Sequence, residues 1–224
     1  QDPRNRGTIV SFRFLNRTAK RPLAFLGLCF VAIALAFFAF WHLLPEYDPP
    51  AFFSFAVHSV FFAVPHAGDV LSNLPFLFAG FFGLWILAKI PSDQPSDTST
   101  ETLTDKLANK SPLAPQIKHL GKLLAWASIL TCFGSAYFHW DPTPERLFWD
   151  RLPMTLGFSS IAALLVSDRI ELNLGKQLSM LLMPVGFLTV IGLKFGWINL
   201  RPYLVLQFGT LALIAIIAIF KKPG

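Results

Sequence analysis

Residues 132–157, CFGSAYFHWDPTPERLFWDRLPMTLG, join two strongly apolar stretches through a short polar elbow. Ser135 and His139 stand four positions apart, so on a helix they share one face. Asp150 follows at the mouth of the next apolar stretch. A hydroxyl, an imidazole and a carboxylate therefore gather at the same end of two adjacent apolar helices. Ionisable groups in such a place are typical of functional sites in membrane proteins.

The composition of the whole chain indicates the class of protein. Hydrophobic residues make up 54% of the 224 residues and charged residues 14%, and the mean hydropathy is +0.53. Uncharged runs approach the roughly 20 residues that cross a bilayer as a helix. The sequence therefore predicts an all-α, polytopic transmembrane helix bundle. The net charge of +6 requires no nucleic acid as a partner, because basic residues of membrane proteins report their topology.

Six membrane spans are predicted in a single transmembrane domain, residues 22–224, which follows a basic cytoplasmic tail at 1–21. The apolar runs lie at about 22–44, 70–88, 120–138, 152–167, 178–193 and 202–220. A polar, proline-rich loop at about 91–118 separates the second span from the third. Residues 51–65 are apolar but short, so whether they re-enter the membrane is left open.

Basic residues predict the orientation of the bundle. If the N-terminus is inside, four of the 19 Lys and Arg residues fall in outer segments: Arg146, Arg151, Lys194 and Arg201. The excess on the other side favours a cytoplasmic N-terminus. One set of polar residues then lies in the outer half of the bundle, on the periplasmic or lumenal side: Asp69, Ser72, Asn73, Ser135, His139, Asp150, Tyr203 and Gln207. A site inside a helix bundle requires such convergence from several helices.

Ordinary structural roles stand beside the functional one for these residues. Asp150 precedes a Leu-Pro pair and could be the N-cap of the next helix, with the proline in its first turn. Ser135 could bond to the preceding turn of its own helix, and His139 could lie in the interfacial aromatic belt. Asn73 is expected to make interhelical hydrogen bonds rather than chemistry. Each ordinary role is at least as plausible alone, but three such residues on one membrane side favour a site.

The motifs GSAYFH at 134–139 and WDRLPM at 149–154 resemble the alkaline ceramidase family. That family belongs to a wider group of integral-membrane hydrolases that includes the adiponectin-receptor-like proteins. LSNLPF at 71–76 and LRPY at 200–203 resemble its bacterial branch, and the similarity covers roughly residues 64–210. The family's fold is a seven-helix bundle around a zinc ion, and its members hydrolyse ceramides to a sphingoid base and a fatty acid. The resemblance implies an incomplete seven-helix core here, preceded by an extra N-terminal helix.

The resemblance also implies a role for each polar residue of the elbow. His139 would be a zinc ligand, Asp150 would orient or deprotonate the metal-bound water, and Ser135 would stabilise the oxyanion of the tetrahedral intermediate. Zinc lowers the pKa of bound water toward about 7 and polarises the carbonyl group, and a donor aimed at the oxyanion lowers the barrier further. The other outer polar residues would support this cluster. The substrate would be a membrane lipid that enters laterally from the bilayer.

The sequence departs from the family's pattern in its metal ligands. The family closes its zinc site with an H-x-x-x-H pair on its last helix, and no such pair follows His139 in this sequence. Catalytic zinc takes three protein ligands, so either the protein is longer by about two helices or the metal has been lost. His42, His58 and His66 are predicted on the outer side and could compensate, although nothing in their spacing requires it.

Two functions follow from these observations. The leading one is a zinc-dependent, ceramidase-like hydrolase that acts on the linear amide bond of ceramide-like lipids. The alternative is a non-catalytic lipid-binding or receptor-like member of the same fold that has lost the metal site. A transporter is less well supported, because the sequence shows no pair of broken helices in matching halves.

Overall fold

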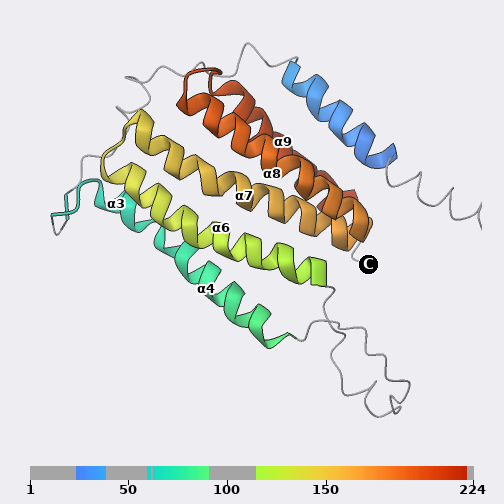
Figure 1. The fold of residues 1–224 in the computed structure, drawn as a ribbon, viewed down its shortest axis with the longest axis horizontal. Helices are drawn as coiled ribbons and strands as arrows, with labels where there is room; N and C mark the ends of the chain where they lie inside the picture. Colours follow the sequence, from blue (N-terminus) through green and yellow to red (C-terminus); the bar gives the residue numbers. More distant parts are fainter. Residues whose placement is uncertain (1–23, 39–59, 62, 91–114, 221–224) are drawn as a thin grey trace, which may run out of the picture.

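A computed structural model of the chain describes residues 24–38, 60–61, 63–90 and 115–220. In this part of the chain the regular secondary structure is all helical, and one isolated β-bridge joins Phe61 to Val64. The helices, shown in Figure 1, are Ala24–Phe38, α3 (Ala67–Leu71), α4 (Leu74–Lys89), α6 (Pro115–Trp140), α7 (Pro144–Arg169), α8 (Leu172–Lys194) and α9 (Arg201–Phe220). The predicted all-α class is confirmed.

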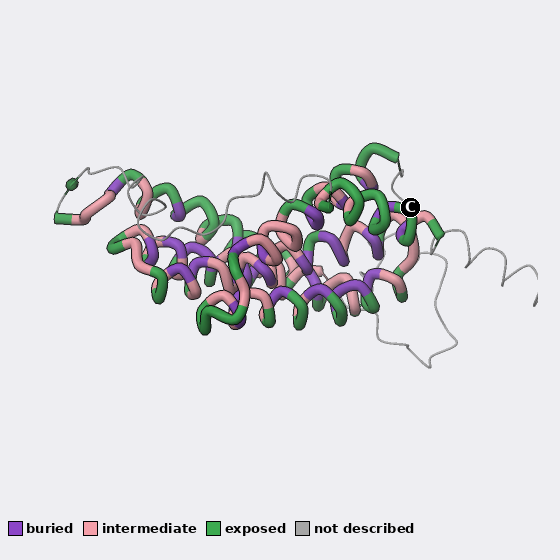
Figure 2. The backbone as a smooth tube through the Cα atoms, turned by 90° about the horizontal axis from the view of Figure 1, so that it is seen from above, coloured by how far each residue is buried: buried purple, intermediate pink, exposed green. Residues whose placement is uncertain are grey.

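The helices lie side by side; α3 leads directly into α4, and from α4 to α9 each helix runs opposite to the one before it (Figure 1). α7 is the central helix, with α6 on one side of it and α8 and α9 on the other, while α4 packs against α6. The Ala24–Phe38 helix joins a buried apolar cluster with α7, α8 and α9 through Leu26 and Cys29. Figure 2 shows the buried positions along the inside of the bundle and the exposed positions around it.

Three of the described helical segments are long and apolar enough to cross a membrane: Ala67–Lys89, which combines α3 and α4, then α8 and α9. The Ala24–Phe38 helix is apolar but shorter. α6 and α7 have 26 residues each but carry more polar side chains. α7 buries four hydroxyl residues against its neighbours: Thr155, Ser159, Ser160 and Ser167. Its polarity fits its central place, because a helix covered by other helices shows little surface to lipid.

The polar elbow is shorter than predicted. α7 begins at Pro144, whereas the apolar run starts near Leu152, so residues 141–143 alone connect α6 to α7. Thr143 caps α7, since its hydroxyl accepts a hydrogen bond from the backbone N–H of Arg146 at 3.3 Å. Pro144 occupies the first helical position, where its missing N–H costs nothing.

The other helix boundaries lie closer to those predicted from the sequence. α6 begins at Pro115, so the last four residues of the predicted 91–118 loop form its first turn. The rest of that loop lies outside the described residues, as do the basic tail at 1–21 and the end of the first span at 39–44. Most of the 51–65 segment lies outside them too.

Small residues let the helices approach closely. A Cβ atom on Gly80 of α4 would lie 2.6 Å from the carbonyl oxygen of Ala125 on α6. A Cβ atom on Gly175 of α8 would lie 2.5 Å from the carbonyl oxygen of Ala163 on α7. Both distances are too short for a real side chain, so these glycines allow the backbones to touch. This mode of packing is common where helices associate inside membranes.

Candidate functional site

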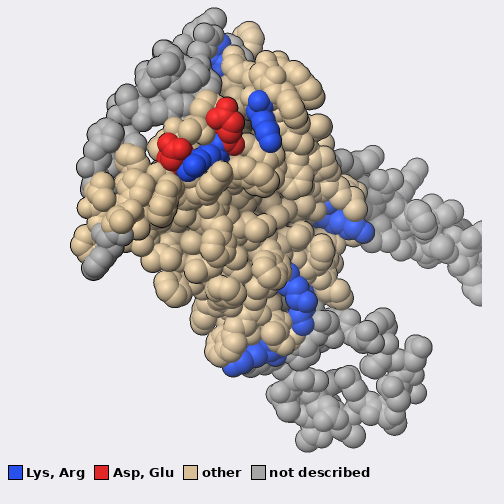
Figure 3. Space-filling view, turned by 60° about the vertical axis from the view of Figure 1, so that its left-hand side comes forward, with Lys and Arg blue, Asp and Glu red and all other residues tan. Residues whose placement is uncertain are grey.

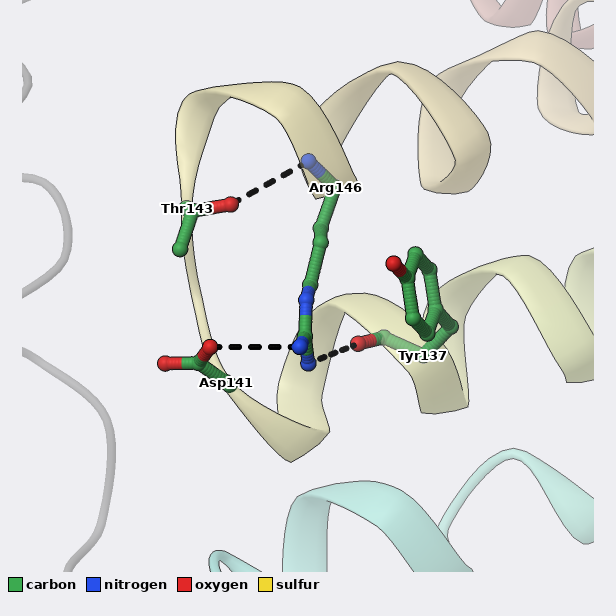
Figure 4. Close-up of polar contacts among 4 residues, drawn as sticks. All are labelled: Tyr137, Asp141, Thr143 and Arg146. Carbon is green, nitrogen blue, oxygen red and sulfur yellow. Dashed lines mark hydrogen bonds and ion pairs between the residues drawn. The ribbon is translucent and has the colours of Figure 1, made fainter.

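Arg146 joins the two helices at the turn between α6 and α7 (Figure 4). Its Nη2 lies 3.2 Å from Oδ2 of Asp141, and its Nη1 donates a hydrogen bond to the Tyr137 carbonyl at 3.4 Å. Its guanidinium carbon lies 4.5 Å from the centre of the Tyr137 ring. Because the Asp141 side chain is 61% exposed, the ion pair contributes at most about 1 kcal/mol. Together the contacts hold the two helix ends in one register.

Close contacts further along α6 and α7 show which residues of the two helices lie opposite one another. A Cβ atom on Gly134 of α6 would collide with the carbonyl group of Trp149 on α7. Deeper in the bundle, a Cβ atom on Gly157 of α7 would lie 3.7 Å from Cβ of Ala127 on α6. The antiparallel pairing therefore brings Ser135, the neighbour of Gly134, to the depth of the peptide bond that follows Trp149.

Asp150 lies inside α7, so its interpretation as a helix N-cap is wrong: Thr143 caps this helix. Its carboxylate is buried, and Oδ2 lies 3.6 Å from Nε of Arg151. That Nε has no hydrogen-bond partner among the described residues, so charge attraction holds the pair. A buried charge requires such a partner, because leaving water is costly for it. Ser135, buried at the same depth, adds a hydroxyl group from α6.

Tyr203 of α9 completes this level of the bundle. Its side chain is fully buried, and its hydroxyl donates a hydrogen bond to Sδ of Met154 at 3.9 Å. The guanidinium carbon of Arg151 lies 5.3 Å from the centre of its ring, a cation–π geometry. Arg151 thus contacts both Asp150 and Tyr203. We call the residues Ser135, Asp150, Arg151 and Tyr203 the polar layer.

Arg151 belongs to the polar layer but is not among the site residues that the sequence predicts. The sequence does contain a signal for it, because a charged residue seven positions into a buried helix is rare unless it has a partner. Gln207, another of the predicted outer polar residues, lies one turn beyond Tyr203 on α9 and is half-buried.

His139 lies one turn beyond Ser135 on α6 and is half-buried, with its ring 5.2 Å from the ring of Phe138. The register places its backbone nearer the end of the bundle than Asp150, by roughly 7 Å at 1.5 Å per residue. Helical side chains lean toward their own N-terminus. In an antiparallel pair, this lean reduces the difference in depth between the side chains of His139 and Asp150.

The described residues do not complete a zinc site around His139. No three His, Cys, Asp or Glu side chains among them lie close enough together to hold a metal ion. Of the three substitute ligands, His66 is described and precedes α3, where its backbone is left-handed with φ 48°. His42 and His58 lie outside the described residues.

The polar residues between α3 and α4 form local hydrogen bonds. Ser72 Oγ and Asn73 Nδ2 each donate to the carbonyl oxygen of Asp69 at 2.8 Å. The Asn73 amide also lies 3.4 Å from the carbonyl oxygen of Val70. These bonds satisfy carbonyl groups at the end of α3. The interhelical role predicted for Asn73 is therefore replaced by a role within its own segment.

An apolar groove of about 710 Å³ lies beside the polar layer, between α6, α7 and α8. Sites for small molecules commonly have volumes of about 300–1,000 Å³. Its lining includes Phe133, Gly134, Tyr137, Trp149, Pro153 and Phe187. No residue of the polar layer is among those that line it. Gly134 and Trp149 are chain neighbours of Ser135 and Asp150, so the groove runs along the contact between α6 and α7 that also carries the polar layer.

The surface around this end of the bundle is mostly uncharged. Figure 3 shows it with the acidic side chains in view lying close to basic ones. Large apolar side chains are exposed here, such as Phe133, Trp149 and Phe195. Comparison with protein-family models, with curated proteins and with solved structures finds no match to this chain.

Proposed function

We propose that this chain is a membrane-embedded hydrolase of the alkaline ceramidase type, which cleaves the amide bond of ceramide-like lipids. The products are a sphingoid base and a fatty acid. The proposal includes a six-span bundle with a cytoplasmic N-terminus, built as an incomplete seven-helix core behind an extra N-terminal helix. The polar layer then lies in the outer half of the membrane. The common depth of two buried groups, the Ser135 hydroxyl and the Asp150 carboxylate, is the observation that carries this proposal.

Amide hydrolysis needs a base and an oxyanion donor. Asp150 takes a proton from the attacking water and passes it to the leaving nitrogen, so that an amine and a carboxylic acid result. Ser135 donates its hydroxyl hydrogen bond to the oxyanion of the tetrahedral intermediate, a contact that is strongest where water is excluded. Arg151 pairs with Asp150 on α7, and the ring of Tyr203 on α9 lies beside the Arg151 guanidinium. The zinc ion that the resemblance implies would bind through His139, and no step here depends on it.

The ion pair of Asp150 favours a second candidate function. With its Oδ2 at 3.6 Å from Arg151 Nε, the carboxylate already has a structural partner. A non-catalytic, lipid-binding or receptor-like protein would use the polar layer to fix α7 against α9. The two candidates differ in one measurable property, which is turnover of a lipid amide.

The test uses the full chain in lipid nanodiscs with a fluorescent short-chain ceramide, and measures the fatty acid released. Asp150→Asn keeps the size of the side chain but cannot take a proton, so turnover should be abolished. Ser135→Ala should lower the rate by about 10²–10³. The matched control is Ser128→Ala on the same helix, because the Ser128 hydroxyl bonds to the Leu124 carbonyl at 3.0 Å. Its turnover should equal that of the wild type.

The outcomes separate the two functions. A wild-type chain that binds ceramide without hydrolysing it is the non-catalytic member. Equal rates for Ser135→Ala and Ser128→Ala would remove Ser135 from the chemistry. Loss of folding in Asp150→Asn, without any separate effect on turnover, would make Asp150 a structural residue only.

A further inference from the structure

Two cavities lie one after the other along α6 and α8, the helices that flank α7. The first is the apolar cavity beside the polar layer, and the second, of about 540 Å³, lies between α6 and α8 near their first turns. One face of α8 lines both cavities at helical spacing, through Lys176, Met180, Met183, Phe187 and Ile191. At 1.5 Å per residue this face extends about 22 Å. We call the two cavities together the α6–α8 groove.

The mouth of the α6–α8 groove is polar and basic. Gln116, His119 and Lys176 lie there, whereas Leu123 and Met183 line the cavity deeper in the bundle. No Asp or Glu is among the described residues that line this cavity. The mouth thus offers the fixed positive charge of Lys176 and the imidazole of His119, with apolar side chains behind them.

Gln116 connects the helix ends that border the mouth of the groove. Its Nε2 donates hydrogen bonds to the Leu172 carbonyl at 2.6 Å and to Ser167 Oγ at 3.4 Å. These bonds tie the start of α6 to the turn between α7 and α8. His119 on α6 is therefore held at a set distance from Lys176 on α8, and the two side chains can contact one head group together.

We propose that the α6–α8 groove binds an anionic phospholipid, with its phosphate at Lys176 and His119 and one acyl chain along the groove. Basic pockets between membrane helices on the cytoplasmic side are typical sites for anionic head groups. This end of the bundle is also the one where the sequence places most of its basic residues. The acyl chain follows the apolar face of α8 from Met180 toward Ile191. The site shares no residue with the polar layer and does not depend on amide hydrolysis.

The test titrates the purified full chain in detergent with phosphatidylglycerol and counts the bound lipid by native mass spectrometry. Lys176→Gln should weaken binding about tenfold, whereas Lys122→Gln should weaken it about twofold or less. Lys122 is an exposed lysine near the same end of α6 that does not line the cavity, so the two variants lose equal charge. Phosphatidylcholine, which has no net charge, should bind more weakly to the wild type.

A second variant tests the acyl chain. Met183→Trp fills the groove without changing its charge, and should prevent phosphatidylglycerol binding while the unfolding midpoint stays near that of the wild type. Inorganic phosphate in excess should not displace the lipid. Equal losses for Lys176→Gln and Lys122→Gln, unchanged binding in Met183→Trp, or displacement by phosphate alone would each overturn the proposal.

Discussion

Gly134 of α6 lies directly against the main-chain carbonyl of Trp149 on α7, where no side chain fits. Gly134→Ala should therefore force the helices apart and lower the free energy of unfolding by about 1–3 kcal/mol, the usual cost of overpacking. The midpoint of thermal unfolding in detergent measures this loss. Gly68→Ala on α3 is the control, because a Cβ atom there would meet nothing within 4 Å. Equal midpoints for the two variants would show that the helix pair can separate at little cost.

The pairing of Asp150 with Arg151 should matter for stability. Asp150→Ala leaves the Arg151 side chain, which is 18% exposed, without its carboxylate partner. We expect a loss of about 3 kcal/mol in the free energy of unfolding, the typical result of breaking a buried pair. Replacing both residues, as Asp150→Ala with Arg151→Met, should restore part of the loss, because no unpaired charge remains.

The chain contains its own control for that prediction. Asp168 and Arg169 are also adjacent on α7, and their Oδ2–Nε distance of 3.0 Å is shorter than the 3.6 Å of the buried pair. The Asp168 side chain is 54% exposed, so Asp168→Ala should cost less than about 1 kcal/mol. If burial decides how much an ion pair contributes to stability, the buried Asp150–Arg151 pair contributes more than Asp168–Arg169, although its atoms are further apart. A larger loss in Asp168→Ala would contradict this argument.

Zinc content tests the metal site that the resemblance implies. We expect residues 1–224 to hold zinc weakly, because the sequence supplies only His139 and Asp150 as ligands that match the family's motifs, and catalytic zinc takes three protein ligands. Metal analysis after dialysis against a weak chelator measures the amount retained. Zinc bound in a one-to-one ratio would contradict the prediction, and loss of that zinc in His139→Ala would locate it. Single substitutions of His42, His58 and His66 would then identify the other ligands.

The orientation of the bundle can be tested by labelling cysteines in intact cells. An impermeant thiol reagent should label Asp141→Cys at the turn between α6 and α7, and should not label Ser96→Cys in the 91–118 loop. The two native cysteines, Cys29 and Cys132, are buried, so they should add little background. The reverse pattern would place the polar layer on the cytoplasmic side.

The sequence predicts the helices well where apolar side chains alone decide them. The run predicted at about 202–220 differs by one residue from α9, Arg201–Phe220. α7 is different, because its first two turns are rich in charged residues and the hydropathy pattern does not include them. The pair Thr143-Pro144 was the available signal for its start, since threonine at the N-cap followed by proline is a common helix beginning.

The polar layer is only partly predictable from the sequence. The helical spacing of Ser135 and His139 follows from the chain alone, but the depth of Asp150 relative to Ser135 depends on the contact between Gly134 and Trp149. Neighbouring residues on a helix point in different directions, so the pairing of Asp150 with Arg151 is not evident from the sequence. The position of the Arg151 guanidinium also depends on the Tyr203 ring of α9, 5.3 Å away, which is a feature of tertiary packing.

The connection of only residues 141–143 between α6 and α7 also bears on how the proposed membrane bundle would assemble. In that bundle, two helices joined so tightly would enter the bilayer together as a helical hairpin. α7 alone would be poorly suited to hydrocarbon, because Asp150 and Arg151 would have to leave water without neighbours around them. α6 would cover one side of α7 from the start, and α8 and α9, which follow in the chain, would cover the others. The short turn would thus couple the insertion of the most polar helix to the arrival of the helices that shelter it.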